Sequence, residues 1–300
     1  MSLRAELIRL GLRLLLKRHK QPFDVQTWRD NMRGMETWVP RSPRGTETIV
    51  VDTGRIKFCR IRTQASRPER HLLYLHGGAY ISGAPIYYRH FTWRIADALK
   101  THVWTLEYRL APEHPFPAAL EDAFEGYKWL LEQTTEGSRL FVMGDSAGGG
   151  LALSLLLKLR DERISLPLAA VAMSPWTDLA LTGESLKLNA KVDPMLNPRD
   201  VPEFVRCYLA GADPTSPYAS PLYGETSGLP PVLIQVGSDE ILRDDARRMA
   251  EKLRANNARS RLEIWPRMPH VWQLFVPVLP EAHAAIAQIG SFVAELEDAI

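Results

Sequence analysis

A serine lies at the centre of the segment Gly144-Asp145-Ser146-Ala147-Gly148, which matches the pattern G-x-S-x-G. The apolar run RLFVM directly precedes this segment, and the apolar helical pattern LALSLLLKLR directly follows it. A sharp turn between a strand and a helix lifts the hydroxyl of its central residue out of the sheet. The helix N-terminus stabilises negative charge that develops there. We therefore predict Ser146 as a nucleophile; the alternative is a tight turn whose serine only caps the helix.

A glycine turn, His76-Gly77-Gly78-Ala79, follows a second apolar run, HLLYL. Acyl transfer creates an oxyanion, and the loss of one backbone donor to that oxyanion costs about 10²–10³ in rate. Small residues let the main chain approach the substrate closely. We expect Gly77, Gly78 and Ala79 to form an oxyanion hole in which Gly78, Ala79 and Ala147 supply N–H groups. A glycine turn that merely leaves a strand is the alternative.

A general base is expected among the eight histidines. Only His270 comes just beyond the last predicted strand, in the loop RMPHVW, where an imidazole can lean toward Ser146. The other histidines occupy predicted strands, helices, the glycine turn or a proline-rich loop: His19, His71, His76, His90, His102, His114 and His283.

The acid that orients the imidazole should follow a neighbouring strand. Asp239 comes immediately after PVLIQVG and gives the chain order Ser, Asp, His that is typical of this kind of site. We predict Asp239 as the acid, with Asp178, in SPWTDL, as the rival. Four further carboxylates are assigned to helices or loops: Asp193, Asp213, Asp244 and Asp245.

The elements around these motifs alternate between strand-like and helix-like patterns, which predicts an α/β fold with a mostly parallel central sheet flanked by helices. Ligands bind beyond the carboxyl ends of the strands in such a sheet, and each motif lies at such an end. The predicted strands are 47–51, 56–62, 71–75, 102–108, 139–143, 168–173, 231–236 and 261–265. The predicted helices lie near 87–100, 117–133, 147–162, 240–256 and 280–298.

The alternation stops between Thr177 and about Leu229, where prolines cluster and a helix is expected at 199–210. We interpret residues 1–300 as a single catalytic domain, with a cap formed by about 1–45 and about 178–229. Together these segments would cover the strand ends.

Composition excludes several other classes of protein. The net charge of +2 argues against a nucleic-acid partner. No H-E-x-x-H or G-x-x-x-x-G-K-[ST] motif is present, so neither a metal nor a nucleotide cofactor is expected. The two cysteines, Cys59 and Cys207, are far apart and are predicted to be buried reduced thiols, which favours a cytoplasmic location.

The N-terminal segment MSLRAELIRLGLRLLLKRHK is rich in leucine and arginine. Charged residues interrupt its apolar run, so neither a secretory signal nor an integral membrane segment is expected. Its leucines recur at helical spacing, at positions 3, 7, 10 and 14. We expect this helix to pack on its own protein; a position on an anionic membrane is the alternative.

The chain resembles the hormone-sensitive-lipase-like branch of the α/β hydrolases, the bacterial family IV esterases, in the subgroup with the motif GDSAGG. The matching segments are HGGAY (76–80), YRLAPEHPFPAALED (108–122), GDSAGGG (144–150), SPWTDL (174–179), GSDEILRDD (237–245) and MPHVW (268–272). This resemblance implies a helical cap, a cofactor-free serine esterase acting on short- to medium-chain acyl esters, and the triad Ser146, Asp239 and His270. It also implies that the YRLAPE block braces the site.

Two residues depart from the family's pattern. Ala79 stands where a third glycine is usual, and Val271 where a glycine usually follows the base. We expect both to alter the substrate range, together with Trp272, rather than the reaction. Several aromatic side chains are candidates either for an acyl pocket or for the core: Trp28, Trp38, Tyr80, Tyr87, Tyr88, Trp176 and Tyr208.

The partner is predicted to be a small-molecule ester, and the protein a monomer or homodimer. The rival from another class is a binding protein on the same scaffold without catalysis. Amidase, peptidase, lactonase and interfacial lipase activities stay open.

Overall fold

The computed structural model describes residues 2–16, 23–34, 39–135, 137–256 and 259–298. Its centre is an eight-stranded sheet in the order β1-β2-β4-β3-β5-β6-β7-β8. The first pairings, β1 with β2 and β2 with β4, are antiparallel, and all the others are parallel. The predicted fold class is therefore confirmed.

The eight strands follow the predicted apolar runs closely. They are β1 (Glu47–Asp52), β2 (Lys57–Arg62), β3 (Arg70–Leu75), β4 (His102–Glu107), β5 (Arg139–Asp145), β6 (Ala169–Met173), β7 (Val232–Gly237) and β8 (Arg261–Trp265). The central strands β3 and β5 to β7 are buried along almost their whole length because helices cover both faces of the sheet.

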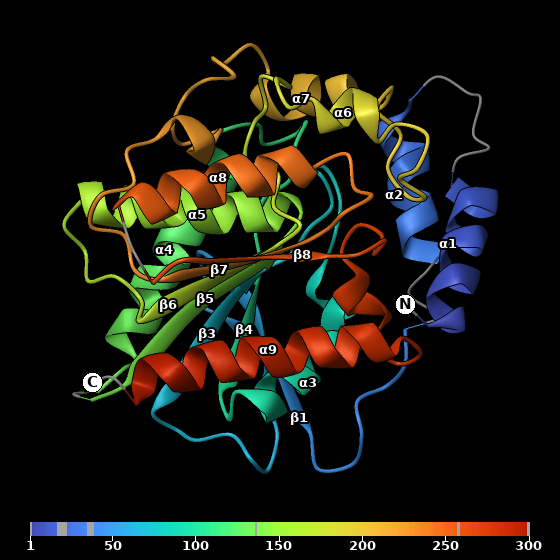
Figure 1. Ribbon diagram of the computed structural model, residues 1–300. Coiled ribbons are helices and arrows are strands. Elements are labelled where there is room, and N and C mark those ends of the chain that lie inside the picture. Colours follow the sequence, from blue (N-terminus) through green and yellow to red (C-terminus); the bar gives the residue numbers. More distant parts are fainter. Residues whose placement is uncertain (1, 17–22, 35–38, 136, 257–258, 299–300) are drawn as a thin grey trace.

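Two layers of helices enclose this sheet (Figure 1). One face carries α4 (Ala118–Glu132), α5 (Ala147–Asp161) and α8 (Arg243–Asn256), and the other carries α3 (Pro85–Ala98) and α9 (Pro280–Glu297). Successive side chains of β3 point to opposite faces of the sheet, and both faces are buried. Leu73 and Leu75 lie in the core on the side of α4, α5 and α8, whereas Leu72 and Tyr74 lie in the core on the side of α3 and α9.

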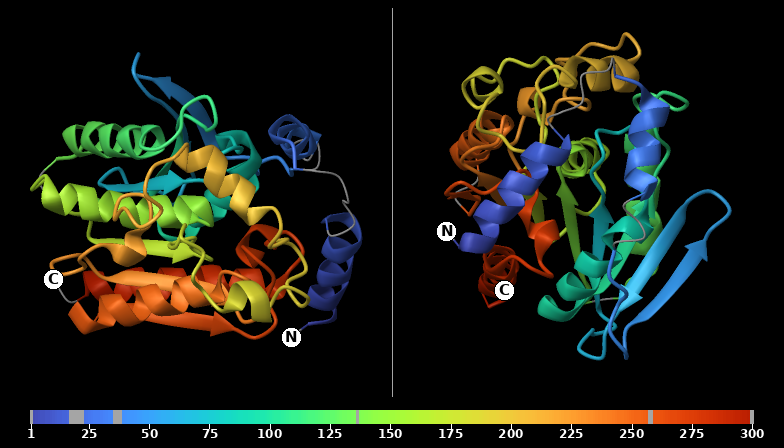
Figure 2. Two further views of the ribbon diagram at one scale, coloured as in Figure 1. Left: turned by 90° about the horizontal axis from the view of Figure 1, so that it is seen from above. Right: turned by 90° about the vertical axis from the view of Figure 1, so that its right-hand side faces the viewer.

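Four further helices lie at the side of the sheet toward which the parallel strands point: α1 (Leu3–Leu16), α2 (Val25–Gly34), α6 (Ser185–Leu188) and α7 (Val201–Leu209) (Figures 1 and 2). The last of these matches the helix expected at 199–210, and residues 177–229 contain no strand. The N-terminal helix and the long insertion therefore meet over the edge of the sheet where the sequence motifs end.

Candidate active site

The nucleophile turn joins β5 directly to α5. Ser146 adopts φ 54° and ψ −122°, a conformation that side-chain-bearing residues rarely occupy. A Cβ on Gly144 would lie 2.1 Å from Gly148 O, and one on Gly148 would lie 2.1 Å from Leu75 O. Both positions therefore exclude every residue but glycine, which explains the spacing of the G-x-S-x-G pattern.

Ser146 contacts His270, which lies in the loop after β8. The Oγ atom of Ser146 is 2.8 Å from Nε2 of His270. The other ring nitrogen, Nδ1, is 2.7 Å from Oε2 of Glu240. Because a carboxylate only accepts hydrogen bonds, Nδ1 carries the proton and Nε2 accepts the hydroxyl of Ser146. The three side chains thus form a continuous Ser–His–Glu relay.

The acid in this relay is Glu240, and the prediction of Asp239 is wrong in geometry. Asp239 points toward α1, where its Oδ2 atom accepts a hydrogen bond from Nη2 of Arg9 at 2.6 Å. Adjacent residues in the turn after β7 direct their side chains to different sides, so Glu240 faces His270 while Asp239 faces the N-terminal helix. A one-residue difference in position decides which carboxylate meets the imidazole.

Glu240 is fully buried, and its second oxygen is anchored as well. Its Oε1 atom accepts hydrogen bonds from Ser174 Oγ at 2.7 Å and from Gly237 N at 2.5 Å. Ser174 Oγ in turn accepts the N–H of Val271 at 3.1 Å. Sequence reasoning missed both Glu240 and Ser174; the available signal was a second carboxylate beside Asp239 in the same strand-end turn.

The remaining carboxylates serve other contacts. Asp178, the rival acid, accepts hydrogen bonds from Thr182, Tyr223 and Arg248. The others accept hydrogen bonds from the following backbone N–H groups: Ile241 to Asp193, Thr215 to Asp213, Ser185 to Asp244, and Thr177 and Asp178 to Asp245. These contacts fix loops around the site and leave Glu240 as the carboxylate at the base.

The glycine turn after β3 has an unusual backbone. Gly78, Ala79 and Tyr80 have φ values of 119°, 55° and 63°. A Cβ on Gly78 would lie 2.1 Å from Ser82 O. The N–H groups of Gly78 and Ala79 find no acceptor among the described residues, and Ala147 begins α5, where an N–H has no intrahelical acceptor.

Gly77, in contrast, does not have a free donor. Its N–H donates to Oδ1 of Asp145 at 3.0 Å. This bond holds Gly77 in the turn, so its N–H is not available to a ligand, and the expected donors Gly78, Ala79 and Ala147 are the available ones. A Cβ on Gly77 would lie 2.4 Å from Oδ2 of Asp145, so glycine is required here too.

Asp145 connects the nucleophile turn with the glycine turn. Besides the N–H of Gly77, its carboxylate accepts the hydroxyl groups of Tyr74 at 2.7 Å and of Tyr88 at 3.4 Å. Burial raises the pKa of Asp145 to about 6, against the opposing effect of these hydrogen bonds. At neutral pH the carboxylate is ionised and acts as a strong acceptor for all three donors.

The protonation of the base depends on its partner. Burial alone lowers the pKa of His270, but the hydrogen bond and the negative charge of Glu240 outweigh that effect and hold the pKa above its usual range. Burial also raises the pKa of Glu240, against the opposing influence of His270. The imidazole is therefore matched to accept a proton near neutral pH.

Comparison with known proteins agrees with this geometry. A family model described as the alpha/beta hydrolase fold matches residues 72–274. The chain is an α/β hydrolase. It is 46% identical over 228 residues to an acetyl-hydrolase of Streptomyces hygroscopicus, covering 76% of each chain. It is 36% identical over 238 residues to an esterase of Acinetobacter venetianus, covering 79% of this chain and 78% of the other.

Among solved structures, an esterase from the bacterial hormone-sensitive lipase family superposes on this α/β hydrolase with a TM-score of 0.92. The two chains are 39% identical, and each is covered to 99%. The predicted membership of the hormone-sensitive-lipase-like branch is thus confirmed. The protein is a serine carboxylester hydrolase, as the sequence predicts.

The two residues in which this hydrolase departs from the family's pattern both have positive φ values, 55° for Ala79 and 48° for Val271. Glycine is favoured at such positions, so each carries some backbone strain. Trp272 is fully buried against Trp265, at a ring distance of 5.6 Å. Its expected influence on the substrate range therefore has no support from its position, because the side chain belongs to the core.

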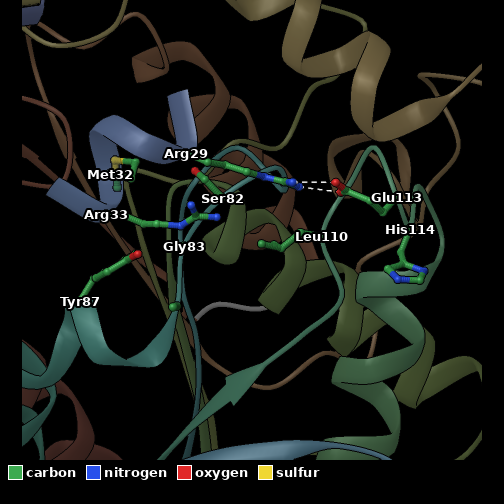
Figure 3. A pocket seen from close by; sticks show the side chains of 10 residues that line it. Arg29, Met32, Arg33, Ser82, Gly83, Tyr87, Leu110, Glu113 and His114 are labelled. Atoms are coloured by element: carbon green, nitrogen blue, oxygen red, sulfur yellow. Dashed lines mark hydrogen bonds and ion pairs between the residues drawn. The ribbon is translucent and has the colours of Figure 1, made fainter. Parts of the chain in front are cut away.

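A pocket of about 400 Å³ lies behind the glycine turn of the hydrolase (Figure 3). Helix α2 forms one wall through Arg29, Met32 and Arg33, and the loop with Glu113 and His114 forms another. The residues of the Ser–His–Glu relay do not line this pocket. It borders the glycine turn through Ser82 and Gly83 and is shaped by the ion pair of Arg29 with Glu113 at 2.6 Å.

The candidate aromatic residues separate into groups. Tyr80 stacks on Tyr208 of α7 at 3.7 Å, and Trp176 lies beside Tyr80 at 6.3 Å. The backbone N–H of Trp176 donates to the backbone oxygen of Ser146 at 3.0 Å, so this buried cluster adjoins Ser146. Trp28 packs on Phe204, Tyr88 binds Asp145, Tyr87 lines the pocket, and Trp38 lies outside the described residues.

The YRLAPE block contacts the glycine turn. The Tyr108 hydroxyl donates to His76 O at 2.7 Å, and the Ala111 N–H donates to Tyr80 O at 2.9 Å. These contacts give the block the bracing position that the resemblance implies. Among the residues that the structure describes, no three His, Cys, Asp or Glu side chains gather as a metal site.

Proposed function

We propose that Ser146, His270 and Glu240 are the catalytic triad of this esterase. The observation that carries the proposal is the relay with distances of 2.8 Å from Ser146 to His270 and 2.7 Å from His270 to Glu240. The Ser146 oxygen attacks the ester carbonyl while its proton passes to Nε2 of His270. That proton then goes to the leaving alcohol as the acyl-enzyme forms. Water activated by His270 releases the acid.

The N–H groups of Gly78, Ala79 and Ala147 stabilise the tetrahedral intermediates in this mechanism. Their support is that the first two have no acceptor among the described residues and the third begins α5. Preorganised donors of this kind act without the cost of reorganising water at the moment of reaction.

Short- to medium-chain acyl esters are the substrates that we infer. The cluster of Tyr80, Trp176 and Tyr208 adjoins the nucleophile and is buried, which leaves little depth for a long acyl chain on that side. One relative of this chain is named an acetyl-hydrolase, in line with a small acyl group.

Helices α1 and α2 and the segment 178–229 act as a cap in this proposal. Arg29 of α2 supports that role, because it donates to Ile81 O at 2.7 Å beside the glycine turn. A cytoplasmic location is supported by Cys59 and Cys207, which are both free thiols.

Turnover of a p-nitrophenyl ester series with increasing acyl length tests the function. We expect the highest kcat/KM at acetate to hexanoate, and a fall of roughly 10⁴–10⁶ for Ser146→Ala. A fluorophosphonate should label wild-type protein at Ser146 and leave the variant unlabelled. A lactone in the same panel tests the cyclic-ester hypothesis. Retention of a tenth of the activity by Ser146→Ala would reject the nucleophile.

A further inference from the structure

Helix α1 is attached to the protein by one face only. Ser2, just before the helix, donates to the Glu281 carboxylate at the start of α9 through its N–H and its hydroxyl, at 2.5 and 2.9 Å. Ala5 is fully buried, and Arg9 reaches the loops after β7 and β8. Ile8 packs against the core as well, so the attached face of the helix carries Ser2, Ala5, Ile8 and Arg9 and not the leucines at 3, 7, 10 and 14.

The leucines occupy the opposite face. Leu3, Leu7, Leu10 and Leu14 follow each other at spacings of three and four residues and are 77%, 60%, 55% and 45% exposed. Leu15 and Leu16 extend the exposed set at the C-terminal end. The helix thus packs on the protein, as expected, but through the face opposite these leucines. A ridge of this kind is unusual on a surface that meets only water.

A neighbouring loop enlarges this apolar surface. Arg13 of α1 donates to the carbonyl oxygens of Lys191 and Val192, at 3.4 and 3.1 Å, so α1 lies beside the segment that follows α6. Leu188, the last residue of α6, is 67% exposed, and Val192 in the following segment is 39% exposed. We use the name apolar ridge for the exposed leucines of α1 together with Leu188 and Val192. These leucines are Leu3, Leu7, Leu10, Leu14, Leu15 and Leu16.

Positive charge surrounds the apolar ridge. Arg4, Arg13, Lys187 and Lys191 are exposed beside it. Three further basic residues, Lys17, Arg18 and Lys20, follow α1 in the sequence and lie outside the described residues. The carboxylate of Glu6 is paired with Arg267 at 2.8 Å, and exposed Glu184 reduces the net positive charge of the loop by one.

We propose that the apolar ridge docks this esterase on an anionic phospholipid surface, with α1 lying in the plane of the interface. Leucines that enter the boundary between headgroups and acyl chains, with cations beside them at the phosphates, are the pattern of an interfacial helix. No helix among the described residues is long and apolar enough to span a bilayer.

Charge favours a lipid surface over a second copy of the chain. In a twofold dimer the same patch meets itself, so the cations around the ridge would face one another across the contact. An anionic membrane instead attracts these cations, and each Lys or Arg near the surface strengthens the binding. The docking face lies across α1 from Arg9, and Figure 2 shows the helix at the outer edge of the molecule.

Vesicle co-sedimentation tests the proposal without any need for turnover. Vesicles of ether-linked lipids, which contain no acyl ester, are made from phosphatidylcholine alone or mixed with phosphatidylglycerol. We expect binding to the mixed vesicles that weakens with salt. Leu7→Ser with Leu14→Ser should reduce the partition coefficient at least tenfold, and Lys187→Gln with Lys191→Gln about tenfold on anionic vesicles only.

Matched variants separate the docking face from general effects. Ile49→Ser with Val50→Ser changes exposed apolar residues on the edge strand β1, and Lys100→Gln with Arg254→Gln removes exposed cations elsewhere. Both pairs should bind like wild type, and all variants should keep wild-type turnover of p-nitrophenyl acetate in solution. Wild-type protein that stays in the supernatant would overturn the proposal. So would a dimer in light scattering that Leu7→Ser with Leu14→Ser converts to a monomer.

Discussion

Arg9 and Asp239, separated by most of the chain, form an ion pair with an N–O distance of 2.6 Å. The same guanidinium donates from Nη1 to Arg267 O, also at 2.6 Å. Asp239 precedes Glu240, and Arg267 lies three residues before His270. One buried cation from the N-terminal helix therefore fastens the two turns that carry Glu240 and His270.

Arg9→Ala should destabilise the protein by about 1–3 kcal/mol, less than a fully buried pair would lose because Asp239 is partly exposed. We also expect kcat/KM to fall about tenfold, since both turns lose a common anchor. Thermal unfolding and ester kinetics measure the two effects. Arg4→Ala, on the exposed side of α1, is the control and should change neither. Equal effects of the two variants would contradict the anchoring role.

Glu240→Gln should reduce kcat about 10⁴-fold, because an amide cannot hold the imidazole tautomer that accepts the Ser146 proton. Asp239→Asn, one residue away, should keep kcat within about tenfold of wild type, because its partner is Arg9 and not the base. Steady-state kinetics on one p-nitrophenyl ester compares the pair. A larger loss of kcat in Asp239→Asn than in Glu240→Gln would instead support Asp239, the acid predicted from the sequence.

The pH profile should show an acid limb above the usual pKa of histidine, about 6.5, because the charge of Glu240 raises the pKa of His270. The base works in its neutral form, so kcat/KM falls as the pH decreases through that value. In Glu240→Gln the residual activity should have its acid limb at lower pH, since burial still lowers the pKa of His270 while the two largest opposing influences, the hydrogen bond and the charge of Glu240, are lost. A limb that stays in place would show that Glu240 does not set it.

Some of these structural features can be predicted from the sequence and others cannot. The strands of the sheet are apolar runs buried on both faces, and the turn at Ser146 requires glycines at positions 144 and 148 on steric grounds. Such local rules make the fold, the turn at Ser146 and the position of His270 beside it predictable. His270 was distinguishable because it follows the final strand.

The acid was not predictable by the same rules. Asp239 and Glu240 are consecutive carboxylates in one turn, and their directions depend on contacts with Arg9, Ser174 and Gly237 from other parts of the chain. Helix α1 gives a similar lesson. Its leucine periodicity predicts a helix, but its polar contacts at Ser2 and Arg9 decide which face meets the protein.

Asp145→Asn should lower kcat by about 10–10²-fold, because a neutral amide is a weaker acceptor for the Gly77 N–H and the Tyr74 hydroxyl. The glycine turn is then held less firmly in position. KM should change little. Steady-state kinetics measures the changes in kcat and KM separately. Tyr88→Phe removes only the longer bond of 3.4 Å and should have a smaller effect. A pure rise in KM for Asp145→Asn would indicate a role in ground-state binding instead.

Tyr208→Ala should shift the acyl preference, raising the ratio of kcat/KM for octanoate over acetate about tenfold as the cluster with Tyr80 opens. The same change should cost about 3–5 kcal/mol of stability through the cavity it leaves. Tyr208→Phe is the matched control: its hydroxyl has no partner among the described residues, so the ratio should stay unchanged. An unaltered ratio in Tyr208→Ala would place the acyl chain elsewhere.

Ser174 lies at the end of β6, between the strand that leads to the nucleophile and the strand that leads to the acid. Its hydroxyl donates to Glu240 and accepts the N–H of Val271, so the turns after three neighbouring strands depend on the pairing of those strands. Hydrogen exchange in these turns should therefore require the opening of the central sheet itself. On heating, the bonds that Ser174 makes should therefore be lost together with the global structure, in one cooperative step.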